Sequence, residues 1–308
     1  MIWPELSYPA WRDTAQTLHL WTQIVGKVRL ALTPWLNHSW QVPFYVTARG
    51  LGTSPIPLGD EIFEMEFDFV EHSLVIRISD GRVRKVALVP QSVADFHASV
   101  LERLRSLDIA VAIHDRPNEI VEGIPFSVDR VHASYDANAA HRFWRTLVSA
   151  DGVFKLFRSG FLGKVSPVHF FWGSFDLAVT RFSGRPAPRH PGGVPALPDA
   201  VVREAYSHEV SSAGFWPGND AFPAPAFYSY AWPEPPGYRH LKMTSGAVFE
   251  PALSEFMLPY ESVRAAPDPE GCLLDFLTDT YKAAAETAHW DRAALECSFG
   301  LPGRVRPV

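Results

Sequence analysis

The chain has 308 residues, of which 47% are hydrophobic and 20% charged, a balance typical of a folded globular protein. Its net charge of −6 argues against a nucleic-acid partner, because such proteins usually carry a basic domain or stripe. No stretch reaches the roughly 18 apolar residues of a membrane helix, and the first residues lack a secretion signal, so we expect a cytoplasmic protein with no membrane partner.

The first half of the chain predicts a helix, then strands, then a second helix. Apolar residues recur at the helical period over 11–32. Segment 41–50 is predicted to be a buried strand, and segment 62–89 a three-stranded meander. Ser92 and Asp95 have the spacing of a capping box and should open the second helix.

Three carboxylates in the meander, Glu64, Glu66 and Asp68, alternate with apolar residues, the pattern of a strand with one wet face. The strands that follow bring three arginines able to neutralise them across the sheet, Arg77, Arg82 and Arg84. A metal cluster is the alternative, but a solvated charged face is favoured, and we assign these residues no function.

The second half repeats this order of elements. A helix is predicted over 138–158, broken near Asp151-Gly152. Strands are predicted within three segments, 165–182, 210–216 and 226–232. A final helix begins at Asp268-Pro269, where the aspartate can cap the helix and the proline fits its first turn.

These elements predict the α+β fold class, with mainly antiparallel sheets and about four main helices. We expect two closely packed halves, 1–125 and 126–308, that repeat one another. The phrases "PWLNHSWQVPFYVTARG" and "FLGKVSPVHFFWGSFDLAVTRF" would then occupy corresponding places. His38 lies in the first phrase between two tryptophans, so a site between the halves is one interpretation.

The segment "VHFFWGSFDLAV" is the first candidate for chemistry. If it is a hairpin with Gly173-Ser174 as a two-residue type II′ turn, His169 and Asp176 share one face of the sheet. A carboxylate beside an imidazole fixes its tautomer and makes it a general base, although a buried pair with a purely structural role is the alternative. If the segment is one continuous strand, the two side chains lie on opposite faces.

The segment "PDAVVREAYSHEVSSAGFWPG" holds a second candidate, His208. A helix through this segment would place Glu204 and His208 four residues apart on one face, where they could ligate a metal together with a distant residue such as His190. If a strand already begins there, His208 and Glu209 diverge. We then expect His208 to point inward, on the same side as Ser212 and Trp216.

Arginines and aromatic residues supply the candidate ligand contacts. Arg181 and Arg185 lie in a loop rich in proline and glycine, where guanidinium groups could bind an anionic substrate or simply be solvated. Large amphipathic rings typical of binding sites follow in the same half, at Trp172, Trp216 and Tyr228.

Four phrases, "LHLWTQIVGKVRLAL", "YVTARGLGTSPIP", "VHFFWGSFDLAVTRFSGR" and "REAYSHEVSSAGFWPG", together resemble an uncharacterised bacterial family of the domain-of-unknown-function type, DUF5996. The resemblance covers nearly the whole chain and implies a single family-wide unit. It implies no activity, cofactor or catalytic residue.

From the residues we expect a small-molecule enzyme in which His169, Asp176 and His208 transfer protons and Arg181 or Arg185 orients an anionic substrate. A non-catalytic small-molecule-binding protein is one alternative, and a self-associating interaction protein is another. The sequence names no cofactor and no oligomeric state.

Overall fold

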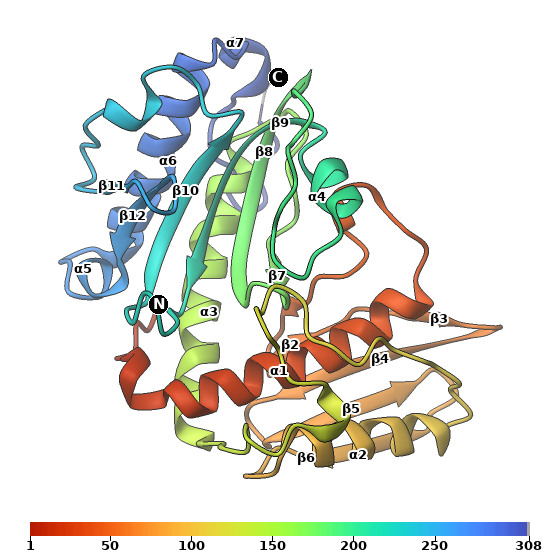
Figure 1. Cartoon of the computed structure of the whole chain (residues 1–308). Coiled ribbons are helices and arrows are strands. Elements are labelled where there is room, and N and C mark those ends of the chain that lie inside the picture. The colour runs from red at the N-terminus through yellow and green to blue at the C-terminus, as the bar shows by residue number, and fades with distance from the viewer. Residues whose placement is uncertain (307–308) are drawn as a thin grey trace.

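Two antiparallel six-stranded sheets flanked by helices make up the protein, which confirms the α+β class (Figure 1). The computed structural model describes residues 1–306. The first half contains α1 (Tyr8–Leu32), η1 (Asn37–Ser39), β1 (Tyr45–Val46), β2 (Gly50–Gly52), β3 (Ile56–Leu58), β4 (Glu61–Asp68), β5 (Ser73–Ile78), β6 (Val83–Ala87), α2 (Val93–Arg105) and η2 (Phe126–Val128).

The second half begins with the long helix α3 and ends with α6 and the short α7. It contains α3 (Ala137–Ser159), β7 (His169–Phe171), β8 (Asp176–Pro186), α4 (Asp199–Ala205), β9 (His208–Trp216), β10 (Ala226–Trp232), η3 (Tyr238–His240), β11 (Val248–Glu250), β12 (Glu255–Pro259), α5 (Tyr260–Arg264), α6 (Pro269–Thr287) and α7 (Arg292–Leu295). Within residues 1–306, no helix is long and apolar enough to cross a membrane.

The ends of the helices follow from local sequence. Helix α2 is capped by the Ser92 hydroxyl, which accepts a hydrogen bond from the Asp95 backbone N–H, as the capping box predicted. Helix α6 begins at Pro269 behind Asp268, whose carboxyl accepts a hydrogen bond from the Gly271 N–H. Both predicted helix starts are therefore confirmed.

The predicted break near Asp151-Gly152 is wrong, because helix α3 continues through both residues. The Asp151 carboxylate lies 2.6 Å from the Lys155 ammonium one turn later, a pair that supports the helix. Gly152 lies next to the end of the Met1 side chain. The glycine is therefore part of the helix and not of a turn.

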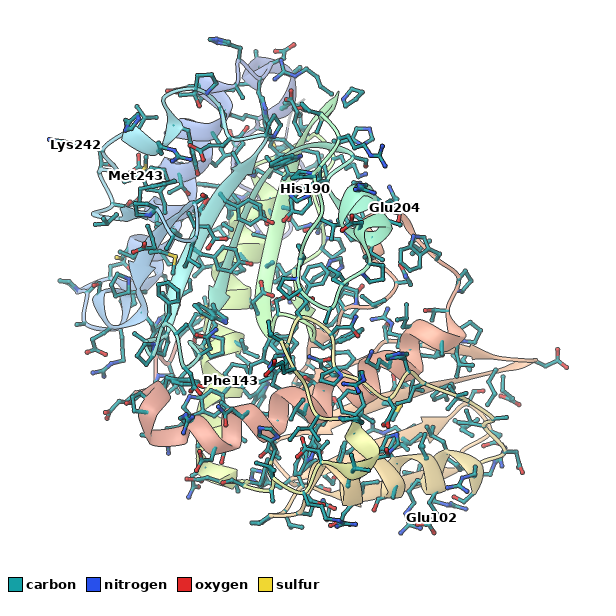
Figure 2. All side chains as sticks on the ribbon, in the orientation of Figure 1. Glu102, Phe143, His190, Glu204, Lys242 and Met243 are labelled. Carbon is teal, nitrogen blue, oxygen red and sulfur yellow. The ribbon has the colours of Figure 1, made fainter. Side chains whose placement is uncertain are left out.

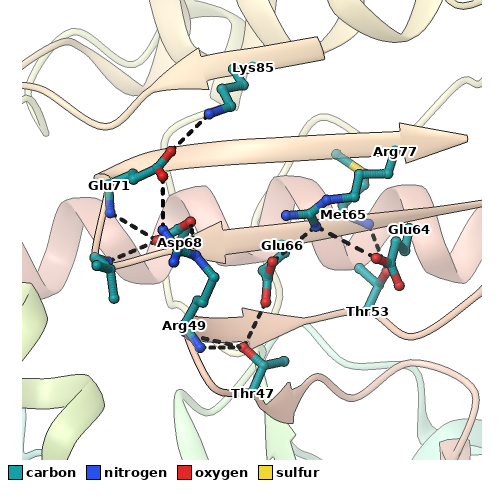
Figure 3. A network of polar contacts seen from close by, with 12 residues as sticks. Thr47, Arg49, Thr53, Glu64, Met65, Glu66, Asp68, Glu71, Arg77 and Lys85 are labelled. Atoms are coloured by element: carbon teal, nitrogen blue, oxygen red, sulfur yellow. Dashed lines mark hydrogen bonds and ion pairs between the residues drawn. The ribbon is translucent and has the colours of Figure 1, made fainter. Parts of the chain in front are cut away.

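The N-terminal sheet has the strand order β1-β2-β4-β5-β6, with β3 paired to β4. The carboxylates on its wet face are matched by basic residues, as Figure 3 shows. Arg77 contacts Glu66 at 2.9 Å and Glu64 at 3.6 Å, and Arg49 contacts Asp68 at 2.5 Å. Glu64 and Glu66 are partly exposed, as a wet face predicts, whereas Asp68 is buried.

Two of the arginines expected to neutralise that face lie elsewhere. Arg82 pairs with Asp80 in its own turn and with Asp108 beyond α2, and Arg84 donates to the Ser106 hydroxyl. Pairing across the sheet depends on strand register, which composition alone does not set.

The C-terminal sheet has the order β11-β12-β10-β9-β8-β7 and presents two different faces. One face, here called the helix face, packs against α3 and α6 through buried residues such as Leu177, Phe215 and Phe227. The opposite face, here called the loop face, is approached by η1, by the loop around Glu119, and by segment 187–207, which carries α4. Figure 1 shows α4 and its loop on the side of the sheet away from α3.

The two sheets meet at Phe44 and Phe170, immediately before β1 and within β7. Each residue donates its backbone N–H to the carbonyl of the other at 2.8 Å, and both side chains are fully buried. Their side chains belong to one continuous hydrophobic core that includes residues of both sheets. The order helix, sheet, helix occurs twice along the chain, while the boundary at 125 and a true duplication remain predictions.

Candidate functional site

The loop face carries an unusual set of acidic and hydroxyl side chains, several of them buried, whereas the helix face is mainly apolar. Strand register places on it Asp176 and Thr180 from β8, Ser212 and Gly214 from β9, Tyr228 and Tyr230 from β10, and Glu255 from β12. Figure 2 labels two residues that approach this face from segment 187–207, His190 and Glu204.

Asp176 lies at the start of β8, in a hairpin with the register predicted from sequence. The turn itself differs from the prediction. Residues 172–175 form a four-residue loop closed by a 2.8 Å hydrogen bond from the Phe175 N–H to the Phe171 carbonyl, and Phe175 has a φ of 61°. The Asp176 carboxyl accepts hydrogen bonds from the hydroxyls of Ser174 and Tyr228.

Gly214 allows Tyr228 to reach Asp176. Tyr228 on β10 and Ala178 on β8 both lie opposite Gly214 on the strand between them. A Cβ atom at Gly214 would overlap the Tyr228 ring and the Leu177 carbonyl oxygen. The missing side chain therefore leaves the space in which the tyrosine crosses β9.

Glu119 is brought to the same place by helix α1 of the other half. The Gln23 side chain accepts from the Asn118 N–H at 2.7 Å and donates to the Asn118 carbonyl at 3.0 Å. Glu119 itself has a φ of 58°, and its carboxyl lies directly against Gly173 in the hairpin loop. A buried polar residue of α1 thus positions an acidic group beside Asp176.

Three carboxyls, Asp176, Glu119 and Glu255, make up what we call the carboxyl cluster. Burial and the nearby Asp176 charge raise the pKa of Glu119 to about 7 and that of Glu255 to about 8, and burial also raises the pKa of Asp176. Within residues 1–306, no basic side chain is among the groups that shift the pKa of either glutamate. The cluster is acidic and lacks a cation of its own.

Hydroxyl and aromatic groups surround the cluster. The Tyr206 and Tyr230 hydroxyls lie 2.8 Å apart, and Tyr230 stacks on Tyr228 with ring centres 6.2 Å apart. His190 stacks on Tyr206 at 4.8 Å and contacts Trp232 at 4.4 Å. Burial raises the pKa of Tyr206 to about 12 and holds that of Tyr228 well above its usual value, so both phenols stay protonated at neutral pH.

The structure separates His169 from Asp176, although the two share a face as predicted. His169 is 1% exposed and packs against Trp40, Tyr45 and Phe171. Burial lowers its pKa to about 3, and Asp176 is not among the groups that shift it. The imidazole is held neutral in an aromatic core without a carboxylate partner.

His208 begins β9, so the strand interpretation of that segment holds and the helical one is wrong. Helix α4 ends at Ala205, which removes the i,i+4 relation between Glu204 and His208. His208 and Ser212 share the loop face, and Glu209 on the other side binds Arg185 at 2.7 Å.

The three weak metal candidates do not converge. Glu204 accepts a hydrogen bond from the Trp35 indole, His190 stacks on Tyr206, and His208 contacts the His38 ring edge-on at 6.1 Å. Among residues 1–306, no three His, Cys, Asp or Glu side chains are grouped closely enough to hold a metal ion.

The two candidate arginines are engaged away from the carboxyl cluster. Arg181 is 3% exposed on the helix face, where its guanidinium lies over the Phe157 and Tyr281 rings at 3.5 and 4.3 Å. Arg185 binds Glu209 and donates to the Ala288 carbonyl at the end of α6. Each arginine has a structural partner, and neither contacts Asp176.

Of the three candidate aromatic residues, only Tyr228 joins the cluster. The Trp172 indole is buried against Gly26 of α1 and donates to the Val42 carbonyl at 2.9 Å. Trp216 is half-buried at the far end of β9 against Phe222. Two surface hollows of about 190 and 400 Å³ lie next to Glu66 and next to Trp290, and the second is also lined by Trp232. None of the three carboxyls lines either hollow.

A comparison with protein-family models matches residues 3–297 to a family of unknown function, DUF5996. The chain belongs to the DUF5996 family. This family carries no assigned activity, and no characterised protein or solved structure matches the chain. The match spans both sheets, so the DUF5996 unit includes all three carboxyls and the helix that positions Glu119.

Sequence reasoning missed several residues of this DUF5996 site. Tyr230 could have been found, because "AFYSYAW" alternates and places Tyr228 and Tyr230 on one face. Glu119 and Glu255 carry no such signal, since one lies in a connecting loop and the other opens a short strand. Their proximity depends on tertiary structure.

Proposed function

We propose that the loop face binds a small organic cation, such as a primary amine, and that Asp176 and Tyr228 exchange a proton with it. The observation that carries this proposal is the carboxyl cluster itself: three acidic groups from separate segments, with raised pKa values and no basic partner. A bound cation would stabilise their ionised forms, because opposite charges within a few ångströms lower carboxyl pKa values.

The neighbouring rings favour an organic ammonium group over a metal ion. Tyr230 stacks on Tyr228, whose hydroxyl donates to Asp176, and Tyr206 contacts Tyr230. Cations bind favourably over such rings. A metal ion would need convergent ligands, which the described residues do not supply.

Asp176 and Tyr228 supply the acid–base step. The Tyr228 hydroxyl donates to Asp176, so it can take a proton from an ammonium as it passes its own to the carboxylate. The amine would then be neutral and nucleophilic. This role replaces the anionic substrate expected from Arg181 and Arg185, since both guanidinium groups are occupied elsewhere.

Calorimetric titration with putrescine and choline at pH 7.5, in two buffers of different ionisation enthalpy, tests the proposal. We expect binding with release of up to about one proton, because the cation lowers carboxyl pKa values that lie near 7 and 8. The double variant Glu119→Gln, Glu255→Gln should bind weakly and release fewer protons, because only Asp176 remains of the three carboxyls.

Inorganic phosphate is the matched anionic probe and should not bind this face. Binding of phosphate, or of amines to the double variant with unchanged affinity, would contradict the proposal.

The Tyr228→Phe variant distinguishes an enzyme from a binding protein. If the protein is an enzyme, Tyr228→Phe should keep amine binding but lose turnover of the amine, which NMR measures. If it is a binding protein, neither the wild type nor the variant should show turnover.

A further inference from the structure

A second group of reactive side chains lies at the other end of the loop face, around Lys164. Lys164 precedes a segment that pairs with β8, and its carbonyl accepts from the Phe182 N–H at 3.0 Å. Phe182 lies six residues after Asp176, roughly 20 Å along an extended strand. This group is therefore independent of the carboxyl cluster.

The Lys164 amine contacts a buried imidazole. Its Nζ lies 2.6 Å from Nε2 of His38, which is 6% exposed. The other ring nitrogen, Nδ1, lies 2.9 Å from the Ala205 carbonyl oxygen, which can only accept a hydrogen bond. Nδ1 therefore carries the ring proton, and Nε2 presents its lone pair to the lysine.

The surroundings of Lys164 and His38 lower the pKa values of both side chains. The ammonium lies over the Trp40 and Phe182 rings at 5.2 and 4.7 Å, and partial burial lowers its pKa. Burial also lowers the pKa of His38, helped by the charge of Lys164 and by His208.

The backbone of His38 shows that this position is strongly constrained. His38 and Ser39 both have a φ of 58°, in the left-handed region that residues with a side chain rarely adopt. Asparagine and histidine tolerate this region better than most residues. The strained turn places the imidazole between α4 and Lys164.

We propose that Lys164 is a nucleophilic amine that forms an imine with an aldehyde, with His38 as the base that takes its proton. Nε2 of His38 accepts a proton from the ammonium, and the free amine attacks the carbonyl carbon to give a carbinolamine. The imidazolium returns the proton to the hydroxyl, which leaves as water when the C=N bond forms. No oxidant or reductant enters this step.

The other lysines provide internal controls. The chain has six lysines, at positions 27, 85, 155, 164, 242 and 282. Burial lowers the pKa of Lys27 to about 8, but Lys27 is 5% exposed and its amine is bound to Asn118. Lys85 and Lys155 form ion pairs with Glu71 and Asp151. Lys164 alone among the six combines an exposed side chain with a histidine acceptor.

Reductive labelling of the intact chain tests the proposal. The protein is incubated with pyridoxal at pH 7.5 and reduced with borohydride, and peptide mass spectrometry gives the labelling rate of each lysine. We expect Lys164 to react about tenfold faster than Lys282, because a lowered pKa enlarges the fraction of free amine. Equal rates at the two lysines would overturn the assignment.

Two variants identify the role of His38. Lys282→Arg should leave labelling of Lys164 unchanged, whereas Lys164→Arg should remove the fast phase. His38→Asn tolerates the left-handed backbone and should slow Lys164 labelling to the rate of Lys282, with a steeper dependence on pH. The groups facing His38 that could contribute to that dependence are Lys164, His208 and Glu204. Unchanged labelling in His38→Asn would exclude the base role.

Discussion

Three carboxyls lie on one face of the N-terminal sheet and three lie at the loop face of the C-terminal sheet, but their surroundings act on them in opposite ways. On the N-terminal sheet, Asp68 is buried, which opposes ionisation, yet hydrogen bonds from Arg49 and from the backbone of Glu71 and Val70 lower its pKa. On the C-terminal sheet, burial raises the pKa of Glu255, and no basic side chain within residues 1–306 is among the groups that shift it. The partners of a carboxylate on a strand therefore decide whether it is a structural ion pair or is free to bind a ligand.

The difference appears in the expected pH dependence. A lowered pKa gives stability that is present above the ordinary carboxyl range and lost as pH falls, and this is the case for Asp68. A raised pKa works in reverse, because the folded state then binds more protons than the unfolded state, so stability falls as pH rises. For Glu119 and Glu255 that fall extends from the ordinary glutamate pKa of 4.5 to about 8.

The largest effect is expected at Asp68. Its carboxylate is 2% exposed, pairs with Arg49 at 2.5 Å, and accepts two backbone N–H groups at 2.9 Å. Asp68→Asn should lower the free energy of unfolding by about 2 to 3 kcal/mol, measured by urea denaturation. The partly exposed Glu64 is the control, and Glu64→Gln should change the free energy of unfolding by less than about 0.5 kcal/mol. Equal losses would show that burial of Asp68 is unimportant.

Gly214→Ala should destabilise by about 2 kcal/mol, because the added methyl overlaps the Tyr228 ring and the Leu177 carbonyl. Gly52→Ala in the N-terminal sheet is the matched control, since its Cβ would lie 3.1 Å from a Thr47 methyl. We also expect Gly214→Ala to abolish amine binding at the carboxyl cluster. A stable Gly214→Ala protein that still bound amines would show that the Tyr228 position is not required.

Glu255→Gln should stabilise the protein at alkaline pH by about 1 kcal/mol, because a neutral amide avoids the ionisation that burial disfavours. The gain should grow as pH rises from about 4.5 to about 8, and it should vanish at pH 4, where the carboxyl is protonated in both folded and unfolded chains. Thermal denaturation across this range measures it. A loss of stability at pH 9 would reveal a basic partner for Glu255.

The smallest effect is expected at the exposed pair between Lys85 and Glu71, whose nitrogen and oxygen lie 2.9 Å apart with both side chains more than half exposed. Lys85→Gln should cost less than about 0.5 kcal/mol at low salt and nothing measurable in 1 M sodium chloride. A larger loss in the free energy of unfolding, or one that persists in 1 M salt, would show that this pair is a structural contact like that of Asp68.

The fold was predictable to the extent that local patterns determine it. Alternating residues gave the wet face of β4, and the Ser92 and Asp268 caps gave two helix starts. The hairpin at Asp176 kept its register although its turn differed, because the predicted loop 173–174 and the observed loop 172–175 have the same centre and both leave Phe171 opposite Asp176.

The candidate site was predictable only in part. Strand alternation predicts that the side chains of Asp176, Tyr228 and His208 lie on one face of the sheet. Glu119 depends on contacts between residues 95 positions apart, such as Gln23 with Asn118, which no local pattern encodes. Arg181 was assigned to a ligand because its sequence neighbours are loop residues, yet its place in β8 turns it to the helix face.

The mutual hydrogen bonds between Phe44 and Phe170 have a consequence for association with other chains. A short strand at the edge of a sheet leaves N–H and C=O groups open to pairing with another molecule. Here each of the two edges covers the other, and both amides are sealed in the core. Opening this junction would expose two complementary edges at once, so a weakened junction should lead to exchange of halves between molecules.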